Sequence, residues 1–311
     1  MLNLTFIIPV LASILILGLV GTLDNAYAEV CHTIADGSWD SAIWENALNN
    51  PCTPLPSDDK SINHVVTMST SVSNSGVIGN FGTLTVSSTL TNTGDIFNQN
   101  IITFTSTAVV NNNGMFENFG GTVTLDPGAI IENNHFLTNN LEGTLINDGT
   151  INNIAGGILN NNNDLTNDGT VTNSGTINNN SGATINNNSG ATLRNNSGST
   201  ITNDFGATIT NDFGATITNI GTTINNGVIL ECGIYTGNLP TPNGLVTCII
   251  TEDTTISQDL TYPCGFTLTV NSGFVYTIDG DSTVTVCGPV TVKDGGGVLI
   301  KFGSTLWVLV N

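Results

Sequence analysis

The side chains best suited to chemistry in this chain are its closely spaced carboxylates. Asp58-Asp59, Glu252-Asp253 and Asp279-x-Asp281 are its tight acidic pairs. Glycoside hydrolases use two such groups, one as an acid and the other as a nucleophile or base. All three pairs stand among turn-forming residues, where Asp is common because its side chain bonds the local backbone. We therefore predict a protein that is not an enzyme and assign no catalytic residue.

Charge narrows the classes of partner. The 311 residues contain four basic side chains, Lys60, Arg194, Lys293 and Lys301, against 24 acidic ones, so the formal net charge is −20. Nucleic-acid binding needs Lys and Arg to displace counterions from phosphates. Attraction to anionic lipid needs the same side chains. Both classes of partner are excluded.

A calcium site is the one cofactor hypothesis that the acids suggest. Asp204 and Asp212 recur in equivalent turns, and Asp148 and Asp168 recur in Asn-Asp-Gly. Stacked carboxylates repel one another, and a divalent cation relieves that repulsion. A solvated acidic surface is the alternative, and it is favoured because the Gly-Gly-x-Gly-x-Asp repeat of calcium-binding rolls is absent from the sequence.

Asp212 also belongs to a repeated Asp-Phe-Gly triplet within ITNDFGATITNDFGATITN, residues 201–219. Kinases use this triplet to hold magnesium, but the glycine-rich loop, strand lysine and His-Arg-Asp that accompany it there are absent from the sequence. Each unit instead joins Thr-Ile-Thr-Asn, which favours a strand, to Asn-Asp-x-Gly, which favours a turn. A helix is excluded because a glycine occurs every six to eight residues, each costing about 1 kcal/mol in a helix.

Strands this short cannot bury a core alone and must stack. Because the units share their letters, Ile is expected on Ile and Asn on Asn in parallel register. The sequence therefore predicts an all-β, single-chain parallel β-solenoid, with coils of about 18 to 24 residues if each has three strands; two strands per coil stays open. Alternation turns one set of residues inward: Ile185, Ile201, Ile209 and Ile217, with Asn173, Asn203, Asn211 and Asn219 at the turns.

The six cysteines predict disulfides. Cys31, Cys52, Cys232, Cys248, Cys264 and Cys287 lie near the two ends of the sequence. An even count without Cys-x-x-C, beside three scattered histidines, favours disulfides in an exported chain over a zinc site. Proximity in sequence favours Cys31 with Cys52 and two bridges among the other four, whose pairing stays open.

Residues 1–28 have the features of an export signal. Leu4 to Val20 is a mostly apolar run without a charge, and Ala26-Tyr27-Ala28 is a small-x-small cleavage site. An uncleaved anchor is the alternative, because about 17 to 20 apolar residues can span a bilayer. We favour cleavage, which leaves no membrane span and predicts a secreted or cell-surface protein.

Residues 35–70 differ from the repeat and contain Gly37-x-Trp39, Trp44, two prolines and Asp58-Asp59 before an alternating strand. This order resembles the N-terminal segment of secreted right-handed parallel β-helix proteins of the pectin-lyase-like kind. The repeat NDGTVTNSGTINN is similar to those of bacterial and archaeal surface β-helices and adhesins. The resemblance implies a structural or adhesive role, with an extracellular glycan-binding or carbohydrate-active protein as the alternative. Cys31 and Cys52 depart from this pattern and predict a disulfide-stapled cap.

Four segments follow from these patterns: a signal peptide (1–28), an N-terminal cap (29–75), Asn/Gly/Thr-rich solenoid repeats (76–227) and disulfide-containing coils with a cap (228–311).

The final STLWVLVN is apolar on both faces, and a terminal strand leaves backbone groups unpaired. We expect it to fold across the open end of the core. The alternative is a docking strand for self-association or for a surface partner.

Overall fold

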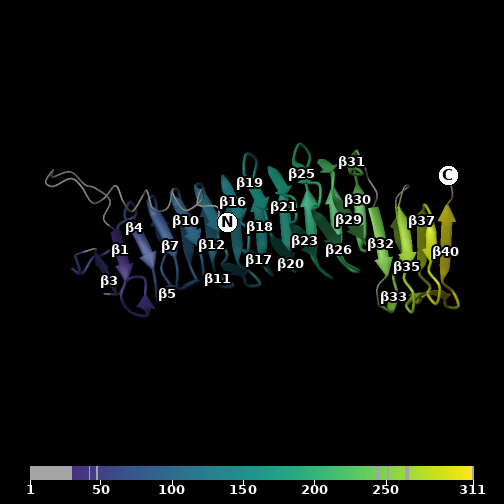
Figure 1. Cartoon of the computed structure of the whole chain (residues 1–311), viewed down its shortest axis with the longest axis horizontal. Helices are drawn as coiled ribbons and strands as arrows, with labels where there is room; N and C mark the ends of the chain where they lie inside the picture. Colours follow the sequence, from purple (N-terminus) through teal and green to yellow (C-terminus); the bar gives the residue numbers. More distant parts are fainter. Residues whose placement is uncertain are drawn as a thin grey trace, which may run out of the picture.

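The computed structural model describes residues 30–41, 43–46, 48–242, 246–250, 252–262 and 266–309. The predicted signal peptide lies outside this part of the chain. Within it, every regular element is a β-strand, usually of four residues, and no helix is long and apolar enough to cross a membrane. The strands follow one another along an elongated rod, with β1 and β3 at one end and β40 at the other (Figure 1).

The strands form five sheets, three of which run along most of the rod. Sheet A contains, in spatial order, β3 (Trp44–Asn46), β1 (Val30–Thr33), β4 (Asp59–Ile62), β7 (Val77–Asn80), β10 (Asp95–Asn98), β13 (Met115–Asn118), β16 (Phe136–Asn139), β19 (Ile158–Asn161), β22 (Thr176–Asn179), β25 (Thr200–Asn203), β28 (Thr222–Asn225) and β31 (Thr241–Pro242). Sheet B contains β2 (Gly37–Ser38), β5 (Val65–Met68), β8 (Thr83–Val86), β11 (Ile101–Phe104), β14 (Thr122–Leu125), β17 (Thr144–Asn147), β20 (Asp164–Asn167), β23 (Thr184–Asn187), β26 (Thr208–Asn211), β29 (Val228–Glu231), β32 (Val246–Ile250), β35 (Thr267–Val270) and β38 (Val290–Val292).

The remaining sheets are shorter. Sheet C contains β6 (Val72–Asn74), β9 (Thr89–Asn92), β12 (Val109–Asn112), β15 (Ile130–Asn133), β18 (Thr150–Asn153), β21 (Thr170–Asn173), β24 (Thr192–Asn195), β27 (Thr216–Asn219) and β30 (Ile234–Gly237). Near the C-terminal end, sheet D contains β33 (Thr254–Ile256), β36 (Val275–Ile278) and β39 (Gly297–Ile300). Sheet E contains β34 (Leu260–Tyr262), β37 (Thr283–Cys287) and β40 (Thr305–Leu309).

Each coil has three strands, which settles the number that the sequence left open. Strands β7, β8 and β9 lie in three different sheets, and β10 returns to the side of β7. Equivalent asparagines of neighbouring coils are between 18 residues apart, as for Asn80 and Asn98, and 24 apart, as for Asn179 and Asn203. The pairing is parallel and in register, so that Ile185 lies beside Ile209 and Asn187 beside Asn211. The predicted parallel β-solenoid is confirmed.

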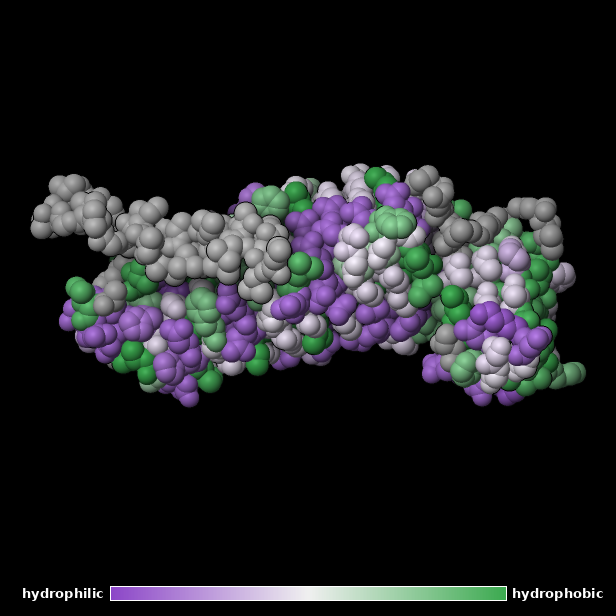
Figure 2. Space-filling model, viewed as in Figure 1, coloured by the Kyte–Doolittle hydropathy of each residue, from purple (hydrophilic) through white to green (hydrophobic). Residues whose placement is uncertain are grey.

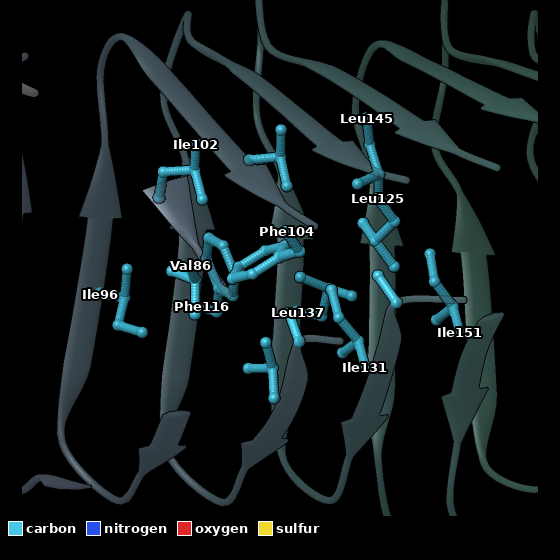
Figure 3. Packing of buried hydrophobic residues seen from close by; sticks show 14 of the residues in the cluster. Val86, Ile96, Ile102, Phe104, Phe116, Leu125, Ile131, Leu137, Leu145 and Ile151 are labelled. Atoms are coloured by element: carbon cyan, nitrogen blue, oxygen red, sulfur yellow. The ribbon is translucent and has the colours of Figure 1, made fainter. Parts of the chain in front are cut away.

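The interior follows the alternation of the strands. The second residue of most strands is buried and aliphatic, and Ile209 is only 2% exposed between neighbouring coils. Side chains from successive coils stack along the axis, and Phe104 lies edge-on against Phe116 (Figure 3). The inward facing predicted for Ile185, Ile201, Ile209 and Ile217 is confirmed.

Buried asparagines at the strand ends form three hydrogen-bonded ladders. In each, the amide nitrogen of one Asn donates to the amide oxygen of the equivalent Asn in the next coil, as Asn173 does to Asn195 at 2.8 Å. The amide nitrogens also donate to backbone carbonyls near the turns, as Asn173 does to Thr200. The sheet A ladder comprises Asn80, Asn98, Asn118, Asn139, Asn161, Asn179, Asn203 and Asn225. The sheet C ladder comprises Asn74, Asn92, Asn112, Asn133, Asn153, Asn173, Asn195 and Asn219. The sheet B ladder is shorter and comprises Asn147, Asn167, Asn187 and Asn211.

All ladder amides point the same way, so each ladder has an oxygen end and a nitrogen end. At the oxygen end of sheet C, the buried ammonium of Lys60 donates to Asn74 at 2.8 Å. At the nitrogen ends, Asn219 donates to the hydroxyl of Tyr235 and Asn211 to the carboxyl of Glu231. Burial lowers the pKa of Lys60 to about 8, against the opposing effect of Asp58 and Asp59. Burial likewise raises the pKa of Glu231 to about 8, so each ionisable group titrates far from its ordinary range.

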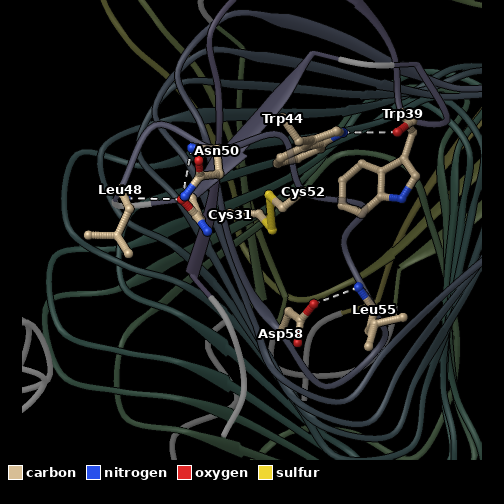
Figure 4. Close-up of a disulfide and its surroundings, with 9 residues drawn as sticks. Cys31, Trp39, Trp44, Leu48, Asn50, Cys52, Leu55 and Asp58 are labelled. Carbon is tan, nitrogen blue, oxygen red and sulfur yellow. Dashed lines mark hydrogen bonds between the residues drawn. A yellow bond between two sulfur atoms is a disulfide. The ribbon is translucent and has the colours of Figure 1, made fainter. Parts of the chain in front are cut away.

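At the N-terminal end of the rod, a short strand and a disulfide stabilise the first strand of sheet A. Strand β3 pairs antiparallel with β1 and covers it from outside. Trp39 and Trp44 meet at 4.9 Å in an edge-on contact, and the Trp44 indole donates to the Trp39 carbonyl (Figure 4). Cys31 and Cys52 form the predicted disulfide beside them.

The C-terminal coils carry further disulfides. Cys232 forms a disulfide with Cys248, and both belong to the four C-terminal cysteines for which the sequence predicts bridges. Cys287 is also disulfide-bonded, and Cys264 lies outside the described residues. The predicted terminal cap is wrong for Thr305–Leu309, because β40 pairs in parallel with β37. Leu306 and Val308 continue the inward columns of Val284 and Val286, and this stacking keeps the strand in the sheet instead of across the end.

Candidate functional site

Three phenylalanines gather on the outer face of sheet A near the N-terminal end. Phe97 points outward from β10, in register with Gly79 of β7, and its ring centroid lies 6.2 Å from that of Phe119. Phe81 and Phe119 are 45% and 41% exposed. We call Phe81, Phe97 and Phe119 the phenylalanine face.

Gly79 explains how the phenylalanine face is assembled. A Cβ atom at this position would lie 3.0 Å from the Phe81 ring, which is tighter than ordinary van der Waals contact. The missing side chain therefore lets the Phe81 ring lie over the backbone of β7. Since Gly79 is the register partner of Phe97, the rings of three successive coils form one surface.

Carboxylates lie on the same face of sheet A. Asp95 opens β10, and Glu117 is the register partner of Phe97 on β13. Burial raises the pKa of Asp95, and the charge of Asp59 raises it further. Burial also raises the pKa of Glu117, with Asp95 as the second cause. Negative charge thus already weighs on both Asp95 and Glu117, so uncharged hydrogen-bond donors fit beside them better than further anions do.

This arrangement suits a ligand with an apolar surface and hydroxyl groups at its edge. Phenyl rings offer apolar area with little conformational entropy to lose, and offset stacking suits ring-shaped partners. Asp95 and Glu117 supply acceptors for hydroxyl donors. The sugar rings of a neutral glycan have both properties.

The sequence reasoning missed the phenylalanine face. Phe81 and Phe119 each follow a ladder asparagine of sheet A directly, Asn80 and Asn118. If the coil length is known, Phe81 and Phe119 fall at the same position of two coils that are separated by one other coil. This would have placed both rings at one corner of the rod, beside Phe97.

The structure does not bring the predicted calcium ligands together. Asp204 follows β25 of sheet A, whereas Asp212 follows β26 of sheet B, so the two turns lie at different corners of one coil. Burial raises the pKa of Asp212, with Glu252 as the second cause. Among the described residues, no group of three or more potential metal ligands occurs. Calcium binding at Asp204 and Asp212 stays a prediction.

Carboxylates do stack at another corner. Asp126, Asp148 and Asp168 follow β14, β17 and β20, which are neighbouring strands of sheet B. Burial raises the pKa of Asp148, followed by the charges of Asp168 and Asp126. The amide of Asn188 donates to Asp168 at 2.9 Å. The coil length of about 20 residues, rather than the eight-residue unit, decides which turns are neighbours.

The three acidic pairs act mainly on turns. Asp58 accepts a hydrogen bond from the backbone of Leu55, and Asp59 from that of Val77. Asp253 accepts one from Val275 of the next coil. Asp279 accepts one from Gly280 and forms an ion pair with Lys301, which, by its hydrogen bond, lowers the pKa of Asp279. Asp58 and Asp279 thus bond the backbone of their own turns, whereas Asp59 and Asp253 hold the first residue of a strand in the next coil.

Comparison of the chain with known protein families, with curated proteins and with solved structures finds no match. The parallel β-solenoid itself is seen directly in the strand pairing. The function must therefore be argued from the rod, its ladders and its outer faces.

Proposed function

We propose that this chain is an exported structural and adhesive element of the cell surface or the extracellular space, without catalytic activity. The observation that carries the proposal is the rod of in-register coils, whose ladders run beside the hydrophobic core from β6 to β30. Such an interior keeps the coils in fixed register, because each amide within a ladder bonds the coils before and after it. A rigid, elongated body with its variable residues outside suits a spacer or a contact surface.

Further features support a place outside the cell. The bridges Cys31–Cys52 and Cys232–Cys248 are typical of oxidising compartments. The net charge of −20 keeps a secreted protein soluble and discourages lateral aggregation. The similarity of its repeat to surface β-helices of bacteria and archaea agrees with these features.

The experiment follows a C-terminally tagged chain in intact cells. The tag should become accessible to added protease without lysis, and the mature protein should begin after Ala28 when its N-terminal peptide is sequenced. Deleting the gene that encodes this chain should weaken attachment of the cells to surfaces. A full-length chain, residue 1 included, that stays protected from protease until lysis would overturn the proposal.

A glycan-binding module is the second candidate, and the phenylalanine face favours it. Affinity electrophoresis on a panel of neutral polysaccharides should show retardation of the native protein. Phe97→Ala and Phe119→Ala should each lose about fivefold in affinity, since one exposed aromatic contact is worth about 1 kcal/mol. Phe205→Ala is the matched control, because Phe205 is a lone turn residue, 83% exposed. Equal binding by all three variants would remove the phenylalanine face from this role.

A further inference from the structure

The last coil of the rod leaves its share of the core uncovered. We call β38, β39 and β40 the open coil. Its inward residues Val292, Ile300 and Val308 pair in register with Val270, Ile278 and Val286 of the coil before. The earlier three are 0% exposed, whereas Val292, Ile300 and Val308 are 44%, 46% and 41% exposed. The inward columns of the core thus end on aliphatic side chains, of a type that is usually buried, that are exposed to solvent.

The backbone of the open coil is also unfinished. In the part of the chain that the structure describes, each of its strands is the last in its sheet and has a neighbour on one side only. The Thr305 amide donates back to Ser282, so by alternation the amides and carbonyls of Leu306 and Val308 face away from β37. Figure 1 places β40 as the final arrow of the rod, and Figure 2 shows hydrophobic side chains gathered at this end.

We propose that the open coil is a self-association surface, through which two copies of this chain join end to end about a two-fold axis. The inference goes beyond the surface role proposed above, and either can fail without the other. A second open coil offers the same three-sided outline and the same set of inward aliphatic residues. Two-fold symmetry sets edge strand against edge strand in antiparallel orientation, which pairs the outward amides and carbonyls.

Charge favours another copy of this same end over the N-terminal end of a neighbour, where residues 30–62 contain five acidic side chains and one basic one. Residues 288–309 contain Lys293, Lys301 and Asp294 as their ionisable side chains, so their formal charge is +1 within a chain of −20. Two rods that approach side by side repel along their length. Two rods that meet at their open coils bring together the ends where acidic charge is lowest.

The N-terminal end of the rod differs from the open coil in sheet A. There β3 already pairs antiparallel with the outer edge of β1, so that edge is not free for the open coil of a neighbour. Head-to-tail growth would give a filament; joining of like ends gives a closed dimer.

The test measures mass and length of the mature, disulfide-bonded protein in solution. Sedimentation equilibrium should give twice the chain mass, and small-angle scattering should give a maximum dimension about twice that of one rod. Ile300→Asp and Val308→Lys each place a charge at the open coil, where the side chain can still reach solvent. Both should yield monomers with native circular dichroism.

Phe205→Lys is the matched control, because it adds a charge to an exposed turn far from the open coil. This variant should stay dimeric. A monomeric native protein across the concentration range would overturn the proposal, as would a dimer without increase in length. Dimers that persist in both charged variants would overturn it too. If the native protein is monomeric but captures a different protein or a vesicle through this end, the occupant is not a second copy and the proposal fails.

Discussion

The middle and the C-terminal part of the rod have the same strand length and coil geometry but different interiors. In the middle, from β15 to β28, the last inward residue of each strand is a ladder asparagine, as in Asn187 of β23. In the C-terminal part, the equivalent residues are apolar or aromatic, as in Val270, Ile278 and Tyr262. Two separate hydrophobic clusters result, one ending at Ile229 and the other beginning at Cys248. Only sheet B runs through the junction from β29 to β32, while sheets D and E replace sheets A and C beyond it.

The difference shows what each interior demands of the sequence. A buried amide must find partners in both neighbouring coils, or it carries the cost of unsatisfied groups. Asparagine therefore recurs at the coil period, and the repeat is visible in the letters. An aliphatic column needs only volume and shape, so the C-terminal coils vary their letters and keep the fold.

The largest expected effect comes from placing an amide in the wrong interior. Val286→Asn buries an amide between Tyr262 and Val308, in a column without a ladder asparagine, where Val286 is 0% exposed. We expect the free energy of unfolding to fall by about 4 kcal/mol, from the lost apolar burial and the unsatisfied amide together. Chemical unfolding followed by circular dichroism measures it.

The matched substitution is Leu125→Asn, directly before the sheet B ladder. Leu125 is also 0% exposed and is the register partner of Asn147, whose amide oxygen has no partner. A new amide there can donate to that oxygen and extend the ladder by one coil, so the loss should be about half that of Val286→Asn. Equal losses in the free energy of unfolding at the two positions would contradict the idea that the ladder supplies a hydrogen-bond partner to an added amide.

A smaller loss is expected when a ladder is interrupted. Asn187 accepts from Asn167 and donates to Asn211, both at 2.7 Å, and also donates to the Thr216 carbonyl. Asn187→Val leaves the oxygen of Asn211 without its donor and should lower the free energy of unfolding by about 3 kcal/mol. Asn186→Val, on the outer face of the same strand, should change it by less than about 0.5 kcal/mol. Similar values for the two variants would show that the ladder bond adds nothing measurable.

The same contrast explains how far the sequence could be interpreted. Strand, turn, parallel register and the facing of Ile209 follow from local alternation, and the structure confirms them. The ends of the ladders could not be predicted, because Lys60 meets Asn74 and Glu231 meets Asn211 only after the coil length is known. The phenylalanine face and the separation of Asp204 from Asp212 likewise depend on the coil length. For the terminal strand, local apolarity predicted a cap, whereas the column of Val284 and Val286 decided its place.

The junction itself provides the smallest and most specific effect, through the pH dependence of stability. Burial raises the pKa of Glu231 from 4.5 to about 8, so between these values the folded chain holds a proton that the unfolded chain has lost. The contribution of Glu231 to the free energy of unfolding therefore falls as pH rises from about 4.5 to about 8, and levels off above. Glu231→Gln keeps an acceptor for Asn211 and removes this titration, so the variant should match the native protein near pH 4.5 and exceed it at pH 9. The neighbouring hydroxyls of Tyr235 and Tyr262 have raised pKa values and stay protonated throughout, while Lys60 and Glu117 titrate equally in both proteins and cancel. Parallel stability curves over the whole range would mean that Glu231 is not the proton-holding end of the sheet B ladder.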